Sequence, residues 1–232
     1  MPQRDYARYG AKLDRRSGRR HLVHHHLLDV AAILDAAFEL NPPLLAALAS
    51  ELGLDQEDAR AFLLTFLALH DLGKIGSFQQ ILDAGDGTNG LGLPLDIYGT
   101  PYREGRGHAF LGQAILHEFV RLNRVWTYCG RRLPFRTTML AMGIAAGHHG
   151  TFPSPKESLS HADNGRHVKK RDLDAAAALI DDLALLFGWK GIFPDFERLS
   201  RASHRLSGLF TACDWFGSNE ASRVHGGPSA AG

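Results

Sequence analysis

The stretch Ala68–Gly76 reads ALHDLGKIG and places His70 directly before Asp71, near the end of an apolar helical run. One side chain offers an imidazole nitrogen and the other a carboxylate, so the pair presents two ligands of different hardness to one point. Seen alone, the pair is weak, because a chain with 13 histidines contains such neighbours by chance. Its significance depends on further candidate ligands near the ends of other predicted helices.

Helical periodicity extends from this pair over almost the whole chain. Apolar spacing predicts helices over 24–40, 44–52, 55–73, from about 107, over 136–149, over 172–187 and after 194. Asp55 is the expected N-cap of the helix that carries His70, and Gly73 is its expected end. The pattern contains no repeat, no linker and no convincing β-hairpin, so we expect an all-α helical bundle.

Two stretches and the tail lack this periodicity. Residues 77–102 and 151–171 are polar or glycine-rich and predict long loops, which are often functional in a compact domain. The expected single domain covers residues 1–225. The low-complexity residues 226–232 predict a disordered tail.

Composition narrows the class of protein. The chain has 232 residues, 44% of them hydrophobic, and a net charge of +1, so no overall basic field favours nucleic acid. The two cysteines form no disulfide framework, and neither a signal peptide nor a membrane-length apolar run is present. We therefore expect a cytoplasmic protein with no membrane partner. No GxxxxGK[ST] phosphate loop, GxSxG elbow or CxxC pair occurs in the sequence.

Seven candidate metal ligands lie at or near predicted helix ends, where the helices of a bundle can converge on one pocket. They are His26, His70, Asp71, His108, His148, His149 and Asp214. This set suffices for two ions if one carboxylate bridges them, and two ions about 3.5–4 Å apart can clamp a phosphoryl transfer. The many imidazoles favour Mn, Fe, Co, Ni or Zn, although Mg remains possible.

Each candidate also has an ordinary structural interpretation. His26 lies in a run of three histidines and is either a ligand or a solvated residue at a helix start, and Asp29 one turn on could orient its ring. The pair His148-His149, seen alone, is more often a partner of a helix C-terminus than a pair of ligands. Lys74 is either a surface lysine or a cation that binds a phosphate oxygen.

Several local strings resemble one family of enzymes. They are HLLDVA at 26–31, HDLGKIGSFQ at 70–79, GHAFLG at 107–112, GHHG at 147–150 and DWFGSNE at 214–220. Their order is similar to that of the HD-domain metal-dependent phosphohydrolases. More narrowly, they resemble the HD nuclease domain of the type I CRISPR helicase-nuclease.

The resemblance implies a fold, a site and a function. It implies an all-α HD-domain bundle in which His26, His70, Asp71 and Asp214 hold one ion, and His108, His148 and His149 hold a second, with Asp71 bridging. Asp71 and Lys74 would be the catalytic residues of a nuclease that cuts single-stranded DNA by two-metal activation of water. The implied partners are the CRISPR surveillance complex and a helicase, present as a subunit or a fused domain.

Two other functions remain open from the sequence. One is an HD phosphohydrolase that acts on nucleotides or cyclic nucleotides, often with one metal and fewer histidines. The other is a non-catalytic HD-like module that only binds a helicase or nucleic acid. The sequence stops soon after DWFGSNE, which leaves open a stand-alone subunit or one domain of a longer helicase-nuclease.

Overall fold

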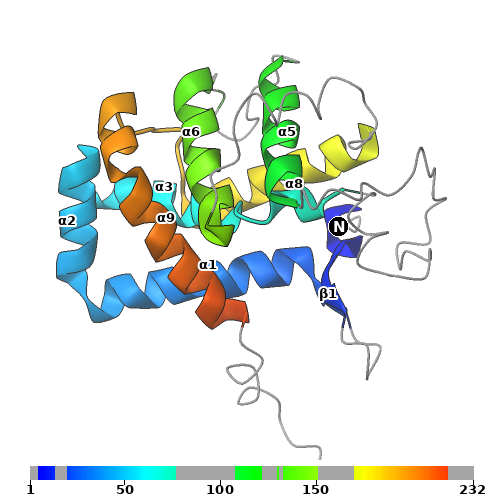
Figure 1. Ribbon diagram of the computed structural model, residues 1–232, viewed down its shortest axis with the longest axis horizontal. Coiled ribbons are helices and arrows are strands. Elements are labelled where there is room, and N and C mark those ends of the chain that lie inside the picture. The colour runs from blue at the N-terminus through cyan, green and yellow to red at the C-terminus, as the bar shows by residue number, and fades with distance from the viewer. Residues whose placement is uncertain are drawn as a thin grey trace, which may run out of the picture.

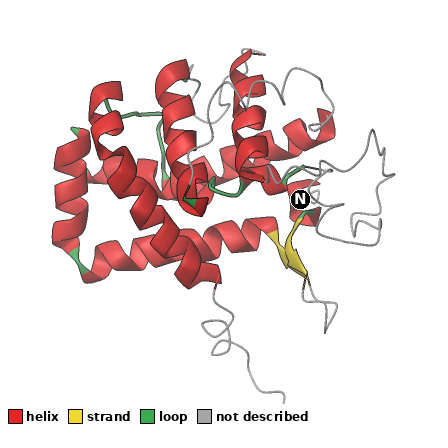
Figure 2. Cartoon of the chain, in the orientation of Figure 1, coloured by secondary structure: helices red, strands yellow, loops and turns green. Residues whose placement is uncertain are grey.

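Helices make up most of the chain that the computed structural model describes, which is residues 5–13, 20–76, 108–121, 130, 133–150 and 170–218 (Figure 2). The α-helices are α1 (Val23–Leu40), α2 (Pro42–Leu52), α3 (Gln56–Ala68), α5 (His108–Arg121), α6 (Phe135–Ala146), α8 (Lys170–Phe187) and α9 (Phe196–Ser218). Short 3-10 turns are η1 (Asp5–Arg8), η2 (Leu72–Lys74) and η3 (Gly147–His149). The predicted all-α class is confirmed. The predicted loop 77–102, residues 151–169 of the second predicted loop and the predicted tail lie outside the described residues, whereas the end of the second loop is wrong because α8 begins at Lys170.

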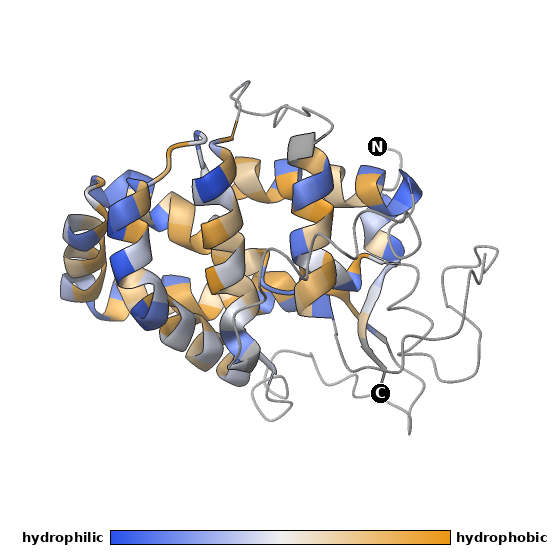
Figure 3. Cartoon of the chain, turned by 45° about the horizontal axis from the view of Figure 1, so that its top comes forward, coloured by the Kyte–Doolittle hydropathy of each residue, from blue (hydrophilic) through white to orange (hydrophobic). Residues whose placement is uncertain are grey.

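The helices surround a core built from their apolar faces. Helix α9 packs on α1 and α6, α5 packs on α6 and η2, and α3 packs on α1. In Figure 1, α9 crosses α1, while α5 and α6 stand side by side above them. Figure 3 shows the helices divided between orange and blue residues, as expected of amphipathic helices around one core. Phe66, Trp189 and Phe193 form an aromatic cluster inside this core.

The bend between α1 and α2 follows Leu40, where Asn41 and two prolines end the first helix. No single helix in the described ranges is long and apolar enough to cross a membrane, although α1 and α2 together, bent by 105°, reach that length and composition.

A small hairpin at the N-terminus corrects the sequence analysis, which expected none. Strands β1 (Gly10–Leu13) and β2 (Arg20–Leu22) pair antiparallel, with Gly10 opposite Leu22 and an irregularity between Gly10 and Lys12. Strands of four and three residues are too short to show the alternation of a half-buried sheet. The side chains of Tyr6 and Tyr9 tie this segment to α8, since their hydroxyls donate to Asp182 Oδ2 and Asp172 Oδ1, each at 2.7 Å.

Helix α3 also ends earlier than expected, at Ala68 rather than Gly73. Asp55 caps its start as predicted, with the side chain accepting a hydrogen bond from the Asp58 backbone N–H at 2.8 Å. At the other end, the backbone N–H of His70 bonds to the carbonyl of Leu67, three residues back, and tight turns continue through η2. This change from α-helix to 3-10 turns places His70 and Asp71 on a turn rather than along a helical face.

Candidate metal centre

The ring of His70 is fixed by the end of its own helix. Its Nδ1 lies 2.8 Å from the carbonyl oxygen of Leu67, and the side chain is fully buried. Because a carbonyl can only accept, Nδ1 carries a proton, and Nε2 is the ring atom turned toward the other candidate ligands. This Nε2 is buried and has no hydrogen-bond partner in the described part of the chain. Donation of Nδ1–H to a carbonyl is the usual way in which a protein orients a histidine toward a metal.

His148 repeats this arrangement at the end of α6. Its Nδ1 lies 3.0 Å from the carbonyl oxygen of Ala145, again three residues back, within a 3-10 turn that follows an α-helix. The rings of His70 and His148 meet edge to face, with centroids 4.9 Å apart. Two helix ends far apart in the sequence therefore direct imidazole Nε2 atoms into one space.

Asp71 lies at the centre of the cluster, and its two oxygens face different histidines. Oδ2 lies 3.0 Å from His26 Nε2 and 3.5 Å from His70 Nε2. Oδ1 lies 2.8 Å from His108 Nε2 and 3.4 Å from His148 Nε2. One carboxylate thus contacts two groups of imidazoles, as a bridging ligand requires.

A second carboxylate, Asp214, approaches the cluster from the last turn of α9. Its Oδ1 lies 3.6 Å from the Nε2 atoms of both His26 and His70, and it accepts a hydrogen bond from Ser218 Oγ at 2.8 Å. Helix α9 reaches this position because Gly217 packs directly on α1. A Cβ atom at Gly217 would lie 2.8 Å from Val30 Cγ2 and 3.0 Å from Val30 Cα, so only glycine permits this close crossing.

The local charges keep both carboxylates ionised. Burial would raise the pKa of Asp71, but the charges of His70, His108 and Lys74 outweigh it and hold that pKa well below its usual range. Burial would likewise raise the pKa of Asp214, but His70 and Ser218 lower it below the ordinary value. Anionic carboxylates are the form that binds a cation.

The surroundings shift the pKa values of His26 and His148, which face different oxygens of Asp71, in opposite directions. Burial lowers the pKa of His26 despite the nearby Asp71 carboxylate, which favours the neutral, metal-binding ring. Burial would also lower the pKa of His148, but the hydrogen bond and charge of Asp71 and the carbonyl of Ala145 raise it.

The residues present fit one or more transition-metal ions. Three sets have ligand atoms within 4.8 Å of one another: His26 with His70 and Asp71, His70 with His148 and Asp214, and Asp71 with His108 and His148. Atoms bound at about 2.1 Å to one ion lie roughly 3.0–3.4 Å apart, close to the separations around Asp71. The mixture of imidazole and carboxylate ligands suits Mn, Fe, Co, Ni or Zn.

The described ligands of the cluster differ in how far they are exposed to solvent. The side chains of Asp214 and His108 are each 17% exposed, whereas His26, His70 and His148 are at most 1% exposed. Within the described part of the chain, the most exposed ligands of the centre are therefore those on α9 and at the start of α5. Lys74 is also buried beside the centre, with Nζ 2.6 Å from Asp71 Oδ2.

The structure thus brings together six of the seven candidate ligands and Lys74. The side chain of the seventh, His149, lies outside what the structure describes, so its role stays a prediction. One proposed detail is wrong: Asp29 Oδ2 lies 3.1 Å from His21 Nε2, whereas His26 Nε2 faces Asp71 and His26 Nδ1 has no hydrogen-bond partner among the described residues. The close-packing role of Gly217 was not predicted, and its signal in the sequence is a glycine three residues after the candidate ligand Asp214.

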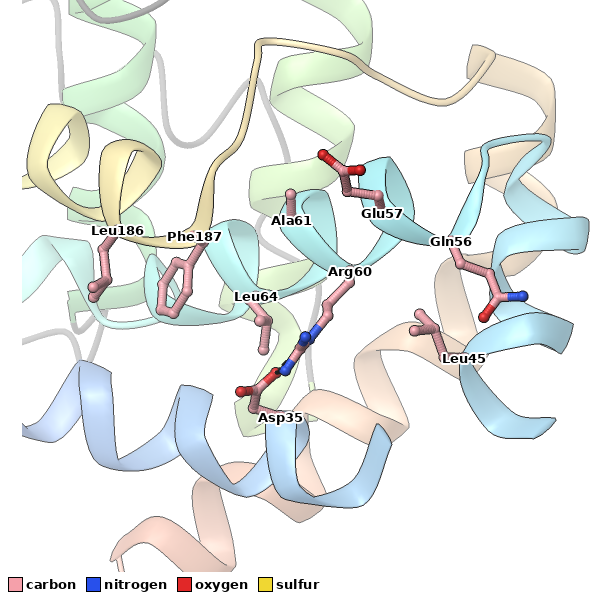
Figure 4. Close-up of a pocket in the computed structure, with 9 residues that line it drawn as sticks. All are labelled: Asp35, Leu45, Gln56, Glu57, Arg60, Ala61, Leu64, Leu186 and Phe187. Carbon is pink, nitrogen blue, oxygen red and sulfur yellow. Dashed lines mark hydrogen bonds and ion pairs between the residues drawn. The ribbon is translucent and has the colours of Figure 1, made fainter. Parts of the chain in front are cut away.

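A separate pocket of about 450 Å³ lies between α1, α2, α3 and α8 (Figure 4). Figure 4 shows the Arg60 guanidinium directed at Asp35, and its Nη2 lies 2.6 Å from Asp35 Oδ1. The other lining residues are Leu45, Gln56, Glu57, Ala61, Leu64, Leu186 and Phe187. None of the candidate metal ligands lines this pocket, so the two features are distinct.

Fold and cluster together define an all-helical domain with a buried histidine–carboxylate centre suited to divalent metal. The chain belongs to the Cas3 HD-domain family, because the family model described as "Cas3, HD domain" matches residues 11–222. A comparison with the curated proteins finds no match.

Solved structures of similar proteins support the family assignment. A structure described as a CRISPR-associated protein is 26% identical, with a TM-score of 0.72 over 97% of this chain and 24% of its own. The Thermus thermophilus Cas3 HD domain, solved in the presence of Ni²⁺, is 20% identical, with a TM-score of 0.60 over 91% of this chain and 77% of its own. T. fusca Cas3 with ATP is 23% identical, with a TM-score of 0.65 over 94% of this chain and 23% of its own. The chain therefore spans about a quarter of the longer proteins that it matches.

Proposed function

We propose that this chain is a metal-dependent nuclease that hydrolyses phosphodiester bonds of single-stranded DNA in CRISPR interference. One observation carries the proposal: the two oxygens of Asp71 face two different groups of histidine Nε2 atoms at 2.8–3.5 Å. A carboxylate shared in this way suits two divalent ions, and two ions close together are typical of phosphodiester hydrolysis. Membership of the Cas3 HD-domain family supports the same function.

The residues of the chain have distinct roles in this proposal. Bound ions would supply Lewis acidity toward the phosphate and activate water. Asp71 holds its negative charge between the histidine groups, and the carbonyls of Leu67 and Ala145 keep the rings of His70 and His148 in the correct tautomer. The Lys74 ammonium, next to Asp71, adds positive charge where a phosphate oxygen would bind.

Similar proteins suggest the partners. One similar structure is described as a CRISPR RNA-guided surveillance complex in a pre-nicking state, and it is 23% identical over 94% of this chain. We propose that this chain works with such a complex and with a helicase, whether as a separate subunit or within one polypeptide. A cytoplasmic location and the absence of a membrane partner are part of the same proposal.

The test combines metal analysis with cleavage assays. Purified protein loaded with Mn²⁺ or Ni²⁺ should hold close to two ions per chain and cut fluorescently labelled single-stranded DNA. Asp71→Ala should slow cleavage by more than about 100-fold, because even the residues that support metal ligands contribute roughly 10–100-fold. Retained cleavage in this variant, or full wild-type activity in excess chelator, would contradict the proposal.

A matched control and two other substrates separate the alternatives. Glu39→Gln also removes a carboxylate, but Glu39 is exposed and lies 13 residues from His26 along α1, about 20 Å at the helical rise. It should cleave like the wild type. One ion per chain with turnover of nucleotides or cyclic nucleotides, but not DNA, would indicate the other HD phosphohydrolase function. DNA binding without metal or turnover would indicate a binding module.

A further inference from the structure

The indole ring of Trp215 is unusually exposed for its place in the fold. It lies in the last turns of α9, and 73% of its surface is accessible to solvent. The neighbouring side chain of Phe216 is 64% exposed. Burial of an aromatic side chain of this size removes 150–250 Å² from water, so Trp215 offers a large apolar face that a ligand could cover.

The helix geometry places Trp215 at the edge of the metal centre. Thr211 Oγ1 lies 3.3 Å from the carbonyl oxygen of His148, and Ser218 Oγ donates to Asp214, so this side of α9 faces the centre. Residues three and four apart are neighbours on a helix, and Trp215 follows Thr211 by four positions and precedes Ser218 by three. Trp215 therefore lies on the part of α9 next to Asp214, which is one of the two most exposed described ligands.

Phe216 leaves the helix in another direction. Each residue is rotated by about 100° around the helix axis from the one before it. Phe216 is therefore turned further than Trp215 from the side of α9 that carries Thr211, Asp214 and Ser218. The described part of the chain thus offers two adjacent exposed aromatic residues, of which Trp215 is turned less far from Thr211 and Ser218.

We propose that Trp215 is a stacking platform for a nucleobase of the single strand whose phosphate lies at the centre. The inference rests on the proposed function and names a binding residue for its substrate. Unpaired bases expose their π-faces, and stacking on an aromatic side chain is worth about 1–3 kcal/mol per base. With a net charge of only +1, the chain has little overall attraction for phosphates, so base stacking supplies affinity that charge does not. Paired bases inside a duplex cannot reach the ring, which favours single strands.

The experiment measures binding separately from cleavage. Fluorescence anisotropy is recorded with metal-loaded protein for labelled oligothymidylate and for an abasic oligonucleotide of the same length, both with cleavage-resistant phosphorothioate linkages. Wild type should bind the oligothymidylate about 5–150-fold more tightly than the abasic strand, which is the stated stacking energy converted to a ratio of dissociation constants. Trp215→Ala should lose this preference and bind the abasic strand like the wild type.

Two further variants and a folding check complete the test. Trp215→Phe should keep most of the preference, and Phe216→Ala should keep all of it. Thermal unfolding should show that Trp215→Ala is as stable as the wild type, because the ring is exposed. Equal affinity of wild type for both strands, or an equal loss of preference in Phe216→Ala, would overturn the stacking proposal.

The outcomes also separate this inference from the proposed function. A wild-type protein that prefers bases through Trp215 but cleaves no DNA would contradict the nuclease proposal and leave the platform intact. A wild-type protein that cleaves DNA but shows no effect of Trp215→Ala on binding would contradict the platform alone.

Discussion

A Cβ atom at Gly73 would lie 1.8 Å from the carbonyl oxygen of His108 and 2.6 Å from the backbone nitrogen of Gly112. The backbone of η2 therefore lies directly against the first turn of α5, with no room for a side chain between them. This contact holds Asp71, two residues before Gly73, beside the imidazole of His108, whose Nε2 lies 2.8 Å from Asp71 Oδ1.

Replacement of Gly73 by alanine should separate η2 from α5. Overpacking of this kind costs about 1–3 kcal/mol, and displacement of His108 from Asp71 should reduce bound metal. Thermal unfolding and metal analysis would measure both effects. Gly208→Ala is the matched control, because a Cβ atom there has no neighbour within 4 Å. Gly208→Ala should stabilise the folded protein by about 0.5–1 kcal/mol, because alanine favours a helix more than glycine does. Wild-type metal content in Gly73→Ala would show that the contact does not position the centre.

Ser218→Ala should weaken metal binding with little effect on the fold. The hydroxyl donates to Asp214 Oδ1 at 2.8 Å, and removal of a group that orients a metal ligand typically costs 10–100-fold in affinity. Competition with a fluorescent chelator would measure the dissociation constant. Ser218→Thr keeps a hydroxyl and should restore most of the affinity, whereas unchanged affinity in Ser218→Ala would mean that Asp214 is oriented by other contacts.

Bound metal should raise the free energy of unfolding, by an amount set by the ratio of the free metal concentration to the dissociation constant. At a free metal concentration 100 times the dissociation constant, linkage contributes about 2.7 kcal/mol. In a chain of this length this raises the melting temperature by roughly 5–10 °C. His148→Ala should lose most of the shift, whereas His204→Ala, at an exposed position of α9, should retain it. An equal shift in both variants would place the bound metal elsewhere.

Tyr9, between η1 and β1, should give the protein an alkaline stability limit. Burial, with Asp172 nearby, raises the pKa of Tyr9 far above its ordinary value of 10.0. The unfolded chain therefore releases this proton first as pH rises, so the stability from Tyr9 is complete below pH 10 and falls above it, by up to about 1.4 kcal/mol per pH unit. Tyr9→Phe should be less stable at neutral pH, by about 1–3 kcal/mol for the lost buried hydrogen bond, but should show a flatter decline above pH 10. Urea unfolding at pH 8 and above would measure both, and parallel declines would assign the limit to other groups.

Much of this architecture could be predicted from local patterns. The apolar spacing that ends at Asn41 predicted α1, and Asp55 predicted the start of α3. Both features depend only on residues close together in the sequence. The end of α3 could not be predicted in this way. The change to 3-10 turns after Ala68 depends on how η2 packs against α5, which involves residues far along the chain.

The candidate centre shows the same division. The histidines and aspartates near helix ends could be recognised in the sequence. The resemblance of local strings to a known family then assigned them to two ions. The assignment of each Asp71 oxygen to a different histidine group was not visible, because it depends on how four separate segments cross in space. Asp29 illustrates the limit: one turn from His26 it suited a supporting role, yet its carboxylate contacts His21 on the neighbouring strand.

The hydrogen bonds from His70 and His148 to carbonyls three residues earlier have a consequence for dynamics. Each ring is tethered to the last turn of its own helix, so fraying of that turn releases a ligand, and a bound ion in turn opposes fraying. Metal occupancy and local order at the ends of α3 and α6 are therefore one coupled equilibrium. Amide exchange at these two helix ends should slow together when metal binds, even though they lie more than seventy residues apart in the chain.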